Sequence, residues 1–220
     1  MATKAKVAKN DAEVQTLELK AIVPQIATIT IEGDSDLILN QMNSVSRRQL
    51  TEARKDKAVD VSEKPNHWEK IITAVHWLGG EPEEFTEKKF RELLKKDAPC
   101  ITCFGLKKSF GEAVTRNKLV TYSTEFHATM NVLGKADNLV PIKFTEHHVD
   151  EKLMSPKRGA PVLVYLNRFS GWSAEFDISY LENVYSLEQI INIVNLAGFG
   201  LGIGSGRTSG YGRYHVANVK

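Results

Sequence analysis

Residues 198–212 read GFGLGIGSGRTSGYG and contain seven of the chain's 15 glycines. Because glycine has no Cβ atom, such a segment can adopt positive φ angles and lets another backbone approach closely. The run lies between a segment with helical periodicity and the strand-like tail from Arg213 to Val219. A glycine run beside a strand is typical of a structural kink or of a loop that contacts phosphate. The fold must therefore hold a glycine-built turn directly before its final strand.

The order of elements around the glycine run argues against two nucleotide-binding motifs. A dinucleotide-binding loop runs from strand through glycines to helix, whereas this segment follows a helix and precedes a strand. A Walker loop needs Gly-Lys-Ser/Thr, but this chain has Gly206-Arg207-Thr208, and Leu201 stands where the first glycine belongs. Two interpretations of the glycine run remain: a tightly packed turn at the end of a helix, or a loop that contacts phosphate. We expect no nucleotide cofactor.

Size, composition and charge are those of an ordinary globular protein. At 220 residues the chain can bury a sizeable core as one domain with an elaboration. Its net charge of +2 is too small to indicate nucleic-acid binding by itself. The way the basic residues cluster is therefore more informative than the net charge. The N-terminus has no apolar leader and no apolar run approaches a membrane span. We expect a cytoplasmic protein without membrane contact.

Cys100 and Cys103 form a single C-x-x-C motif within PCITCFG. The apolar neighbours Ile101 and Phe104 favour a short buried strand in which both cysteines act as small hydrophobic residues. A redox dithiol is one alternative, because such motifs lower the pKa of a thiol. A zinc site is another, with the two further ligands drawn from His127, His147 or His148. We favour burial and expect no bound metal.

Hydrophobic periodicity predicts a mixture of strands and helices after a polar, lysine-rich arm at residues 1–20. Alternation predicts strands at Gln25–Ile31, Glu125–Leu133 and Trp172–Tyr180. Helical spacing predicts helices at 37–57, 66–78, 105–116, one capped by Thr86 and one from the Ser186/Gln189 capping box to Gly198. Residues 21–220 are then one domain, with a helical insertion over about 37–98 and a hairpin arm over about 145–171.

The elements and the C-terminal pattern together carry a family resemblance. The pattern comprises Gly202-Ile203-Gly204, Arg207 and Gly212-Arg213-Tyr214, after a helix that begins near Lys107-Lys108. The chain resembles the RAMP superfamily (repeat-associated mysterious proteins), which includes crRNA-binding backbone subunits of CRISPR effector complexes. It is also similar to uncharacterised phage and prophage proteins. The resemblance implies an α+β fold with a modified ferredoxin-like or RRM-type antiparallel sheet, helices on one face and a protruding β-hairpin arm.

Single-stranded nucleic acid needs cations or free N–H groups for its phosphates and flat side chains for its bases. The glycine run, the Lys107-Lys108 helix start and the hairpin arm offer these groups, and the resemblance implies that they converge. The predicted contacts are Arg47, Arg48, Lys107, Lys108, Lys157, Arg158, Arg168, Phe169, Gly204, Gly206, Arg207, Tyr211 and Arg213. Trp172 is either a further stacking surface or a core residue, and the basic face from Lys88 to Lys96 is expected to be simply solvated.

The sequence therefore predicts a non-catalytic protein that coats single-stranded RNA or DNA as a side-by-side homo-oligomer or filament. We expect it in the cytoplasm of a bacterial cell, and the similarity to phage proteins extends this expectation to a phage-infected cell. One alternative is a metal-independent endoribonuclease of RAMP type, with His127 and His215 as the best acid–base candidates. The other is a protein-interaction module that acts on a host complex. We expect it not to be an enzyme.

Overall fold

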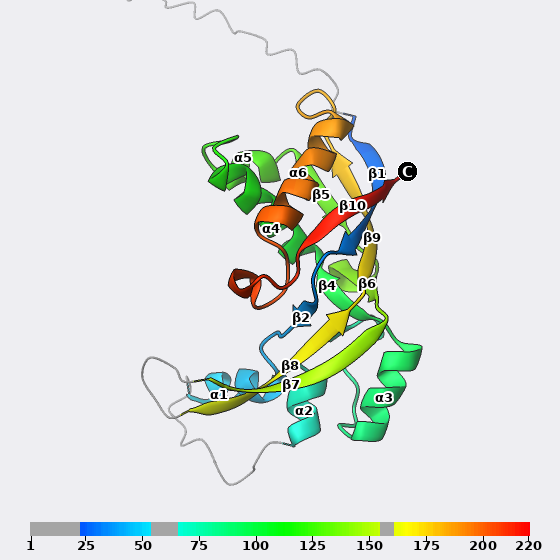
Figure 1. Ribbon diagram of the computed structural model, residues 1–220, viewed down its shortest axis with the longest axis vertical. Helices are drawn as coiled ribbons and strands as arrows, with labels where there is room; N and C mark the ends of the chain where they lie inside the picture. The colour runs from blue at the N-terminus through cyan, green and yellow to red at the C-terminus, as the bar shows by residue number, and fades with distance from the viewer. Residues whose placement is uncertain (1–22, 54–65, 155–160) are drawn as a thin grey trace, which may run out of the picture.

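The computed structural model describes residues 23–53, 66–154 and 161–220 (Figure 1). Its strands form two antiparallel sheets with helices on one face of the larger one, which confirms the predicted α+β class. The strands are β1 (Gln25–Gly33), β2 (Leu37–Leu39), β3 (His76–Trp77), β4 (Pro99–Thr102), β5 (Met130–Leu133), β6 (Leu139–Lys143), β7 (Glu146–Met154), β8 (Val162–Ser170), β9 (Ser173–Tyr180) and β10 (Tyr214–Val219). The helices are α1 (Ser44–Ala53), α2 (His67–Ile72), α3 (Glu87–Lys96), α4 (Cys103–Arg116), α5 (Ser123–His127) and α6 (Leu187–Gly200), with the 3₁₀ turns η1 (Ala136–Asn138) and η2 (Arg207–Ser209).

Strand β9 is the centre of the larger sheet, whose order is β10-β1-β9-β6-β4-β3. It pairs with β1 along one edge and with β5 and β6 along the other. Ile29 of β1 lies opposite Phe176 of β9, and both are buried. The alternation predicted for Gln25–Ile31 and Trp172–Tyr180 is confirmed, because every second side chain enters one core.

Helices α4 and α6 cover one face of this sheet, and α5 lies beside them (Figure 1). Phe110 of α4 stacks on Phe176 of β9, with ring centres 6.3 Å apart. The capping box predicted at the start of α6 is confirmed, since the Ser186 hydroxyl accepts from the Gln189 N–H and the Gln189 side chain accepts from the Ser186 N–H. Within the described ranges, no helix is long and apolar enough to cross a bilayer.

Strands β7 and β8 form a long hairpin that lies with α1, α2 and α3 at the other end of the molecule from α5 (Figure 1). The hairpin pairs from Glu146–Ser170 to Met154–Val162. At its base β8 also pairs with β2, where Leu37 lies opposite Phe169. This three-stranded sheet connects the hairpin to the turn that follows β1.

Two predicted elements are wrong. The helix expected over 37–57 begins only at Ser44, because its first three residues form β2 and pair with β8. The strand expected over 125–133 is the helix α5 followed by β5. Phe126 and Met130 are both buried and lie four residues apart, a spacing that a helical turn satisfies as well as a strand does.

Two helix ends also differ from the expectation. The helix expected over 66–78 ends at Ile72, because the chain then enters β3 and pairs with β4. Helix α6 continues past Gly198 to Gly200. A Cβ atom on Gly198 would overlap the carbonyl oxygen of Tyr214, so this glycine lets β10 pack against α6 and does not end the helix.

The glycine run forms a compact turn between α6 and β10. Three hydrogen bonds fasten it: Ile203 N–H to the Gly212 carbonyl at 2.9 Å, Ser205 N–H to the Ile38 carbonyl at 2.8 Å, and Gly212 N–H to the Asp36 carbonyl at 2.8 Å. The positive φ angles that the sequence predicts occur at Gly202, Gly204, Gly206, Gly210 and Gly212. The glycine turn is therefore attached to Ile38 of β2 and to Asp36, which lies between β1 and β2.

Candidate nucleic-acid interface

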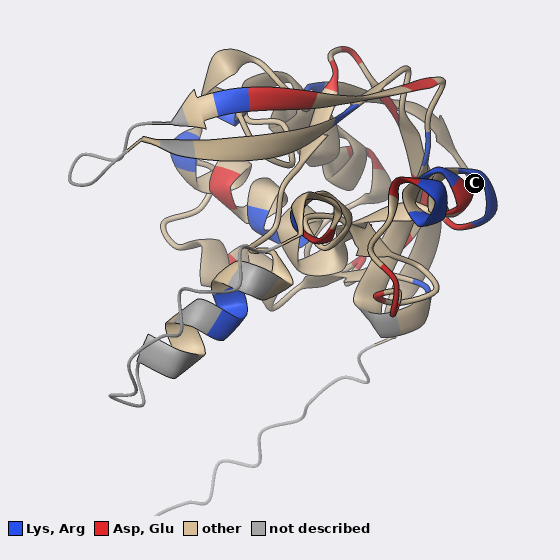
Figure 2. Cartoon of the chain, turned by 90° about the horizontal axis from the view of Figure 1, so that it is seen from below, with Lys and Arg blue, Asp and Glu red and all other residues tan. Residues whose placement is uncertain are grey.

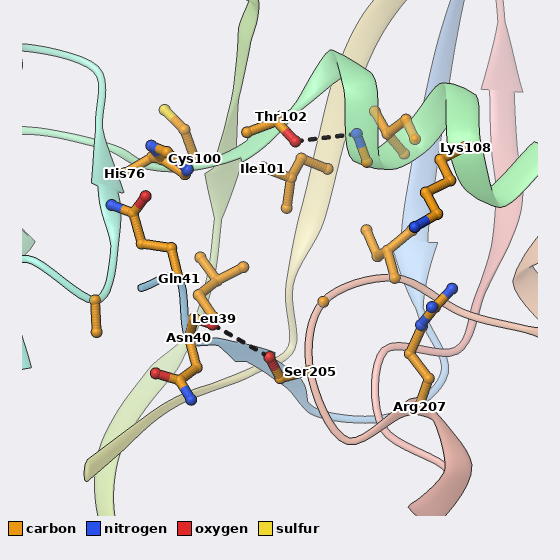
Figure 3. Close-up of a pocket in the computed structure, with 15 residues that line it drawn as sticks. Leu39, Asn40, Gln41, His76, Cys100, Ile101, Thr102, Lys108, Ser205 and Arg207 are labelled. Carbon is orange, nitrogen blue, oxygen red and sulfur yellow. Dashed lines mark hydrogen bonds between the residues drawn. The ribbon is translucent and has the colours of Figure 1, made fainter. Parts of the chain in front are cut away.

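A groove of about 250 Å³ lies between the glycine turn and the start of α4 (Figure 3). Its lining residues come from four segments of the chain: the end of β2 and the two residues after it, the segment around β3, β4 with the start of α4, and the glycine turn. They are Leu39, Asn40, Gln41, Ala74, His76, Cys100, Ile101, Thr102, Gly105, Leu106, Lys108, Ile203, Gly204, Ser205 and Arg207. Segments that lie far apart in the sequence thus form a single concave surface at the edge of the core.

The glycine turn forms one wall of this groove because its backbone approaches β2 closely. Gly204 has a φ of +75°, and a Cβ atom there would lie 2.5 Å from the carbonyl oxygen of Ile38. The neighbouring Ser205 hydroxyl donates to the Asn40 carbonyl at 3.5 Å. This close approach fixes where Arg207 leaves the backbone.

The start of α4 forms the opposite wall. Thr102 caps the helix, because its hydroxyl accepts from the Gly105 N–H at 3.0 Å. The N-terminus of α4 carries the positive end of the helix dipole, which favours an anion nearby. Lys108 points from α4 toward Arg207, which points from the glycine turn toward α4 (Figure 3). Two cations thus face one another across the groove.

The local charge of the groove is positive. Of the 15 described residues that line it, none is an aspartate or a glutamate. Glu112, one turn further along α4, lies outside the lining and forms a long ion pair with Arg207 at 3.5 Å. Figure 2 shows basic and acidic residues interspersed over the ribbon from another side, so the groove differs from its surroundings by excluding carboxylates.

His76 and Cys100 lie at the far end of the groove from Lys108 (Figure 3). Burial, followed by the nearby Arg47 charge, lowers the pKa of His76, so its imidazole is neutral at pH 7. Burial, with the Asp97 charge second, raises the pKa of Cys100 to about 12, and burial also raises the pKa of Cys103. The predicted burial of both cysteines is confirmed, and neither thiol is activated. Among the described residues, no three His, Cys, Asp or Glu side chains cluster as metal ligands would.

The structure brings three of the predicted contact residues together in the groove: Gly204, Arg207 and Lys108. Tyr211 does not line the groove. Its ring packs against Gly206 within the turn, where a Cβ atom on Gly206 would lie 2.9 Å from the ring.

Arg213 and Lys107 point elsewhere. Arg213 donates to the carbonyl of Phe199 at the end of α6 at 2.7 Å, and it does not line the groove with Arg207. Lys107 donates to the Asn131 side chain at 2.6 Å.

The arginines of α1 lie beside a second hollow. Arg47 lines that hollow and pairs with Glu81 at 3.3 Å. Arg48 pairs at 2.8 Å with Glu69, a mostly buried carboxylate. The predicted contacts Lys157 and Arg158 lie outside the described residues.

The hairpin offers no stacking surface at its base. Phe169 is fully buried, because β8 packs it against Phe144 and His147, so its prediction as a stacking residue is wrong. Trp172 is also a core residue, and its indole N–H donates to the Ser35 carbonyl at 2.7 Å.

Arg168 is bound between two carboxylates. Its guanidinium donates to Asp36 at 2.9 Å and to both oxygens of Asp150 at 2.8 and 3.2 Å. A phosphate would have to compete with both carboxylates, so we leave Arg168 out of the proposed interface.

The two histidines predicted as acid–base candidates lie away from the groove. The Nε2 atom of His127 is 3.0 Å from the Lys107 carbonyl, and the Nδ1 atom of His215 is 2.7 Å from an Asp34 oxygen. Sequence reasoning missed His76 and Gln41, which do line the groove. Neither belongs to a motif, and only the pairing of β3 with β4 brings His76 to this surface.

Searches against protein-family models and against curated proteins find no match for this chain. Among solved structures, it is similar to a chain in the cryo-EM structure of Type III-B Cmr-beta bound to cognate target RNA, at 13% identity and a TM-score of 0.47, with 89% of this chain and 59% of that one covered. It is also similar to Cmr6 from Pyrococcus furiosus, at 11% identity and a TM-score of 0.44, with 89% and 98% covered. The chain thus spans about three fifths of the first of these. Both likenesses concern the fold.

Proposed function

We propose that the groove binds the phosphodiester backbone of single-stranded nucleic acid and does not cut it. The observation that carries the proposal is the convergence of Lys108 and Arg207 on a groove that no carboxylate lines. The start of α4 adds a helix dipole of the same sign. A phosphate between the two walls would gain two charge-assisted hydrogen bonds. Among the ion pairs of the described residues it would compete with one of these side chains' pairs, the 3.5 Å pair between Glu112 and Arg207.

A single strand suits this groove better than a duplex does. Duplex DNA carries one negative charge for about every 1.7 Å of its axis, so it is bound by broad basic faces. The view in Figure 2 has charges of both signs interspersed, whereas the basic character of the groove is local. A narrow positive groove that follows one backbone is the usual arrangement for single strands.

The placement of the titratable groups that line the groove favours binding without cleavage. Metal-independent cleavage needs a positioned base and a positioned acid. Of the residues that line the groove, His76 is the one imidazole, and it lies at the far end from Lys108 (Figure 3). We therefore propose a binding protein, for RNA or DNA.

Fluorescence anisotropy with labelled single-stranded RNA, single-stranded DNA and duplex of equal length tests the proposal. The Lys108→Ala, Arg207→Ala double variant should raise the Kd at least about tenfold, because hydrogen bonds to charged groups contribute about 1.5–3 kcal/mol each. It should also flatten the plot of log K against log salt by about 0.7, since the two side chains hold one phosphate and each neutralised phosphate on a single strand contributes about 0.7.

The charge-matched control is Lys88→Ala, Lys95→Ala, which removes the same two charges from the exposed face of α3. This control should leave the salt slope unchanged. Equal losses in both double variants would show nonspecific attraction and would reject the groove. Product gels run alongside should show intact strands, and fragments that disappear in His76→Ala would reject the non-catalytic role.

Assembly of several copies on one strand stays a prediction. Sedimentation velocity with strands of increasing length measures it directly. A sedimentation coefficient that rises in steps with strand length would support side-by-side binding, and a single bound copy at every length would contradict it.

A further inference from the structure

Phe104 is an exposed aromatic residue on the first turn of α4. Its side chain is 75% exposed, although the sequence predicts a buried neighbour of the cysteine motif. It lines a second hollow of about 430 Å³, which lies within the range of small-molecule sites, about 300–1,000 Å³. A large aromatic side chain held in the open beside a hollow is the arrangement used to stack a nucleobase.

The hollow adjoins the phosphate groove. Gln41, His76 and Thr102 line both of them. Phe104 and Lys108 are four residues apart on α4, so they lie on the same face of the helix about one turn from each other. That separation is one that a nucleotide can bridge, with its phosphate at Lys108 and its base at Phe104.

The charge of the hollow suits a neutral group. Arg47 and Glu81 both line it, and they pair with each other at 3.3 Å. The groove beside it carries Lys108 and Arg207 without a carboxylate. A neutral hollow next to a positive groove matches the charge pattern of a nucleotide, whose base is neutral and whose phosphate is anionic.

Two polar side chains, Gln41 and His76, line both the hollow and the groove. The Gln41 amide is held in place, because its Nε2 donates to the Thr73 carbonyl at 3.0 Å and its backbone N–H donates to the Ala74 carbonyl at 2.9 Å. The Gln41 side chain points toward His76 (Figure 3). A neutral imidazole offers one donor and one acceptor. Together the amide oxygen and the imidazole can meet the hydrogen-bonding edge of a base.

We propose that Phe104, Gln41 and His76 form a subsite for one unstacked base, next to the phosphate held by Lys108 and Arg207. This inference rests on the proposed function and deepens it. Because bases in a duplex are already stacked and paired, the subsite admits a base from a single strand and thereby gives the protein its preference for single strands.

The test compares Phe104→Ala with Phe199→Ala. Phe199 is a matched control, since it is 83% exposed at the end of α6 and lines neither hollow. Each protein is titrated with a labelled homopolymer strand and with an abasic strand of the same length and charge. Phe104→Ala should bind the intact strand about tenfold more weakly, with an unchanged salt slope, and Phe104→Trp should restore binding.

The abasic strand supplies the second half of a double-mutant cycle. The wild type should bind the abasic strand at least about tenfold more weakly than the intact one, and Phe104→Ala should lose most of this difference, because only the hydrogen bonds of Gln41 and His76 to the base remain. If Phe104→Ala matches the wild type on the intact strand while Lys108→Ala, Arg207→Ala loses binding, the base subsite is overturned and the phosphate groove stands. If Phe104→Ala instead changes self-association in sedimentation velocity, Phe104 belongs to a protein contact and the subsite is likewise overturned. A wild type that binds neither strand at low salt overturns both proposals.

Discussion

Replacing Gly212 by alanine tests the glycine turn that builds the groove. Gly212 has a φ of +71°, a conformation that costs an alanine about 1–2 kcal/mol. A Cβ atom at this position would also overlap the carbonyl oxygen of Ile203, which belongs to the opposite side of the same turn. Since the Ile203 N–H donates to the Gly212 carbonyl at 2.9 Å, the two sides cannot separate without loss of that bond.

The expected loss of unfolding free energy for Gly212→Ala is about 2–3 kcal/mol. About 1–2 kcal/mol comes from the backbone conformation and about 1 kcal/mol from the broken hydrogen bond. Gly210→Ala is the matched control, because Gly210 has a φ of +87° and a Cβ atom there meets nothing within 4 Å. It should lose about 1–2 kcal/mol, the cost of the conformation alone.

Urea unfolding followed by tryptophan fluorescence measures both variants, and thermal unfolding gives a second measure. For a chain of this size about 1 kcal/mol corresponds to about 2–4 °C in Tm, so Gly212→Ala should melt about 4–12 °C below the wild type. Because the turn also positions Arg207, the folded variant should bind single strands more weakly than Gly210→Ala does. Equal unfolding free energies for the two variants would show that the turn yields freely and would refute the close packing inferred here.

Two further variants test the hairpin. His147 packs against Phe90 and Phe169, and burial lowers its pKa below the ordinary 6.5, so the unfolded chain binds its proton more readily. The unfolding free energy should therefore fall as the pH drops below about 6.5, and it should level off below the pKa that His147 has in the folded protein. Urea titrations between pH 7.5 and 5 measure this dependence, and His147→Gln should show a smaller change of unfolding free energy with pH. Arg168→Met should lower the unfolding free energy by about 1 kcal/mol, because it breaks a partly exposed link to Asp36 and Asp150, and should leave the salt slope of binding unchanged; a reduced slope would return Arg168 to the interface.

The parts of the fold that the sequence predicted correctly are those with a local cause. The strand β9 alternates cleanly between buried and exposed side chains, and the Ser186 capping box marks the start of α6 without help from other segments. The glycine turn is also local, because positive φ angles select glycine whatever surrounds them. These elements need no knowledge of their tertiary neighbours.

The wrong predictions have a tertiary cause. The segment from Glu125 to Leu133 satisfies a strand pattern and a helical pattern equally, and the choice depends on packing against α4 and β9. Phe169 is an aromatic residue in a polar arm, and pairing between β2 and β8 buries it. Phe104 follows an apolar strand, yet the turn into α4 rotates it outward. In the first two cases a long-range contact decides the outcome, and in the third the local start of α4 behind its Thr102 cap decides it.

The candidate interface shows the same limit at the level of single side chains. Arg207 and Arg213 are six residues apart in a basic, glycine-rich segment, and they look equivalent in the sequence. Between them the chain passes through η2, which lies between two glycines of positive φ, Gly206 and Gly210. Arg207 leaves this turn toward α4, while Arg213 follows it and donates to the end of α6.

The same geometry explains how a chain of net charge +2 can present a basic site. A strand that follows the groove meets the charges within about one Debye length, about 8–10 Å at ordinary salt, and not the sum over the surface. The absence of aspartate and glutamate from the groove lining therefore matters more than lysines beyond that distance, although Glu112, 3.5 Å from Arg207, offsets part of the local positive charge. It follows that Lys108→Glu should weaken binding far more than Lys108→Ala. The alanine variant only removes a positive charge, whereas the glutamate variant also places a negative charge in the groove.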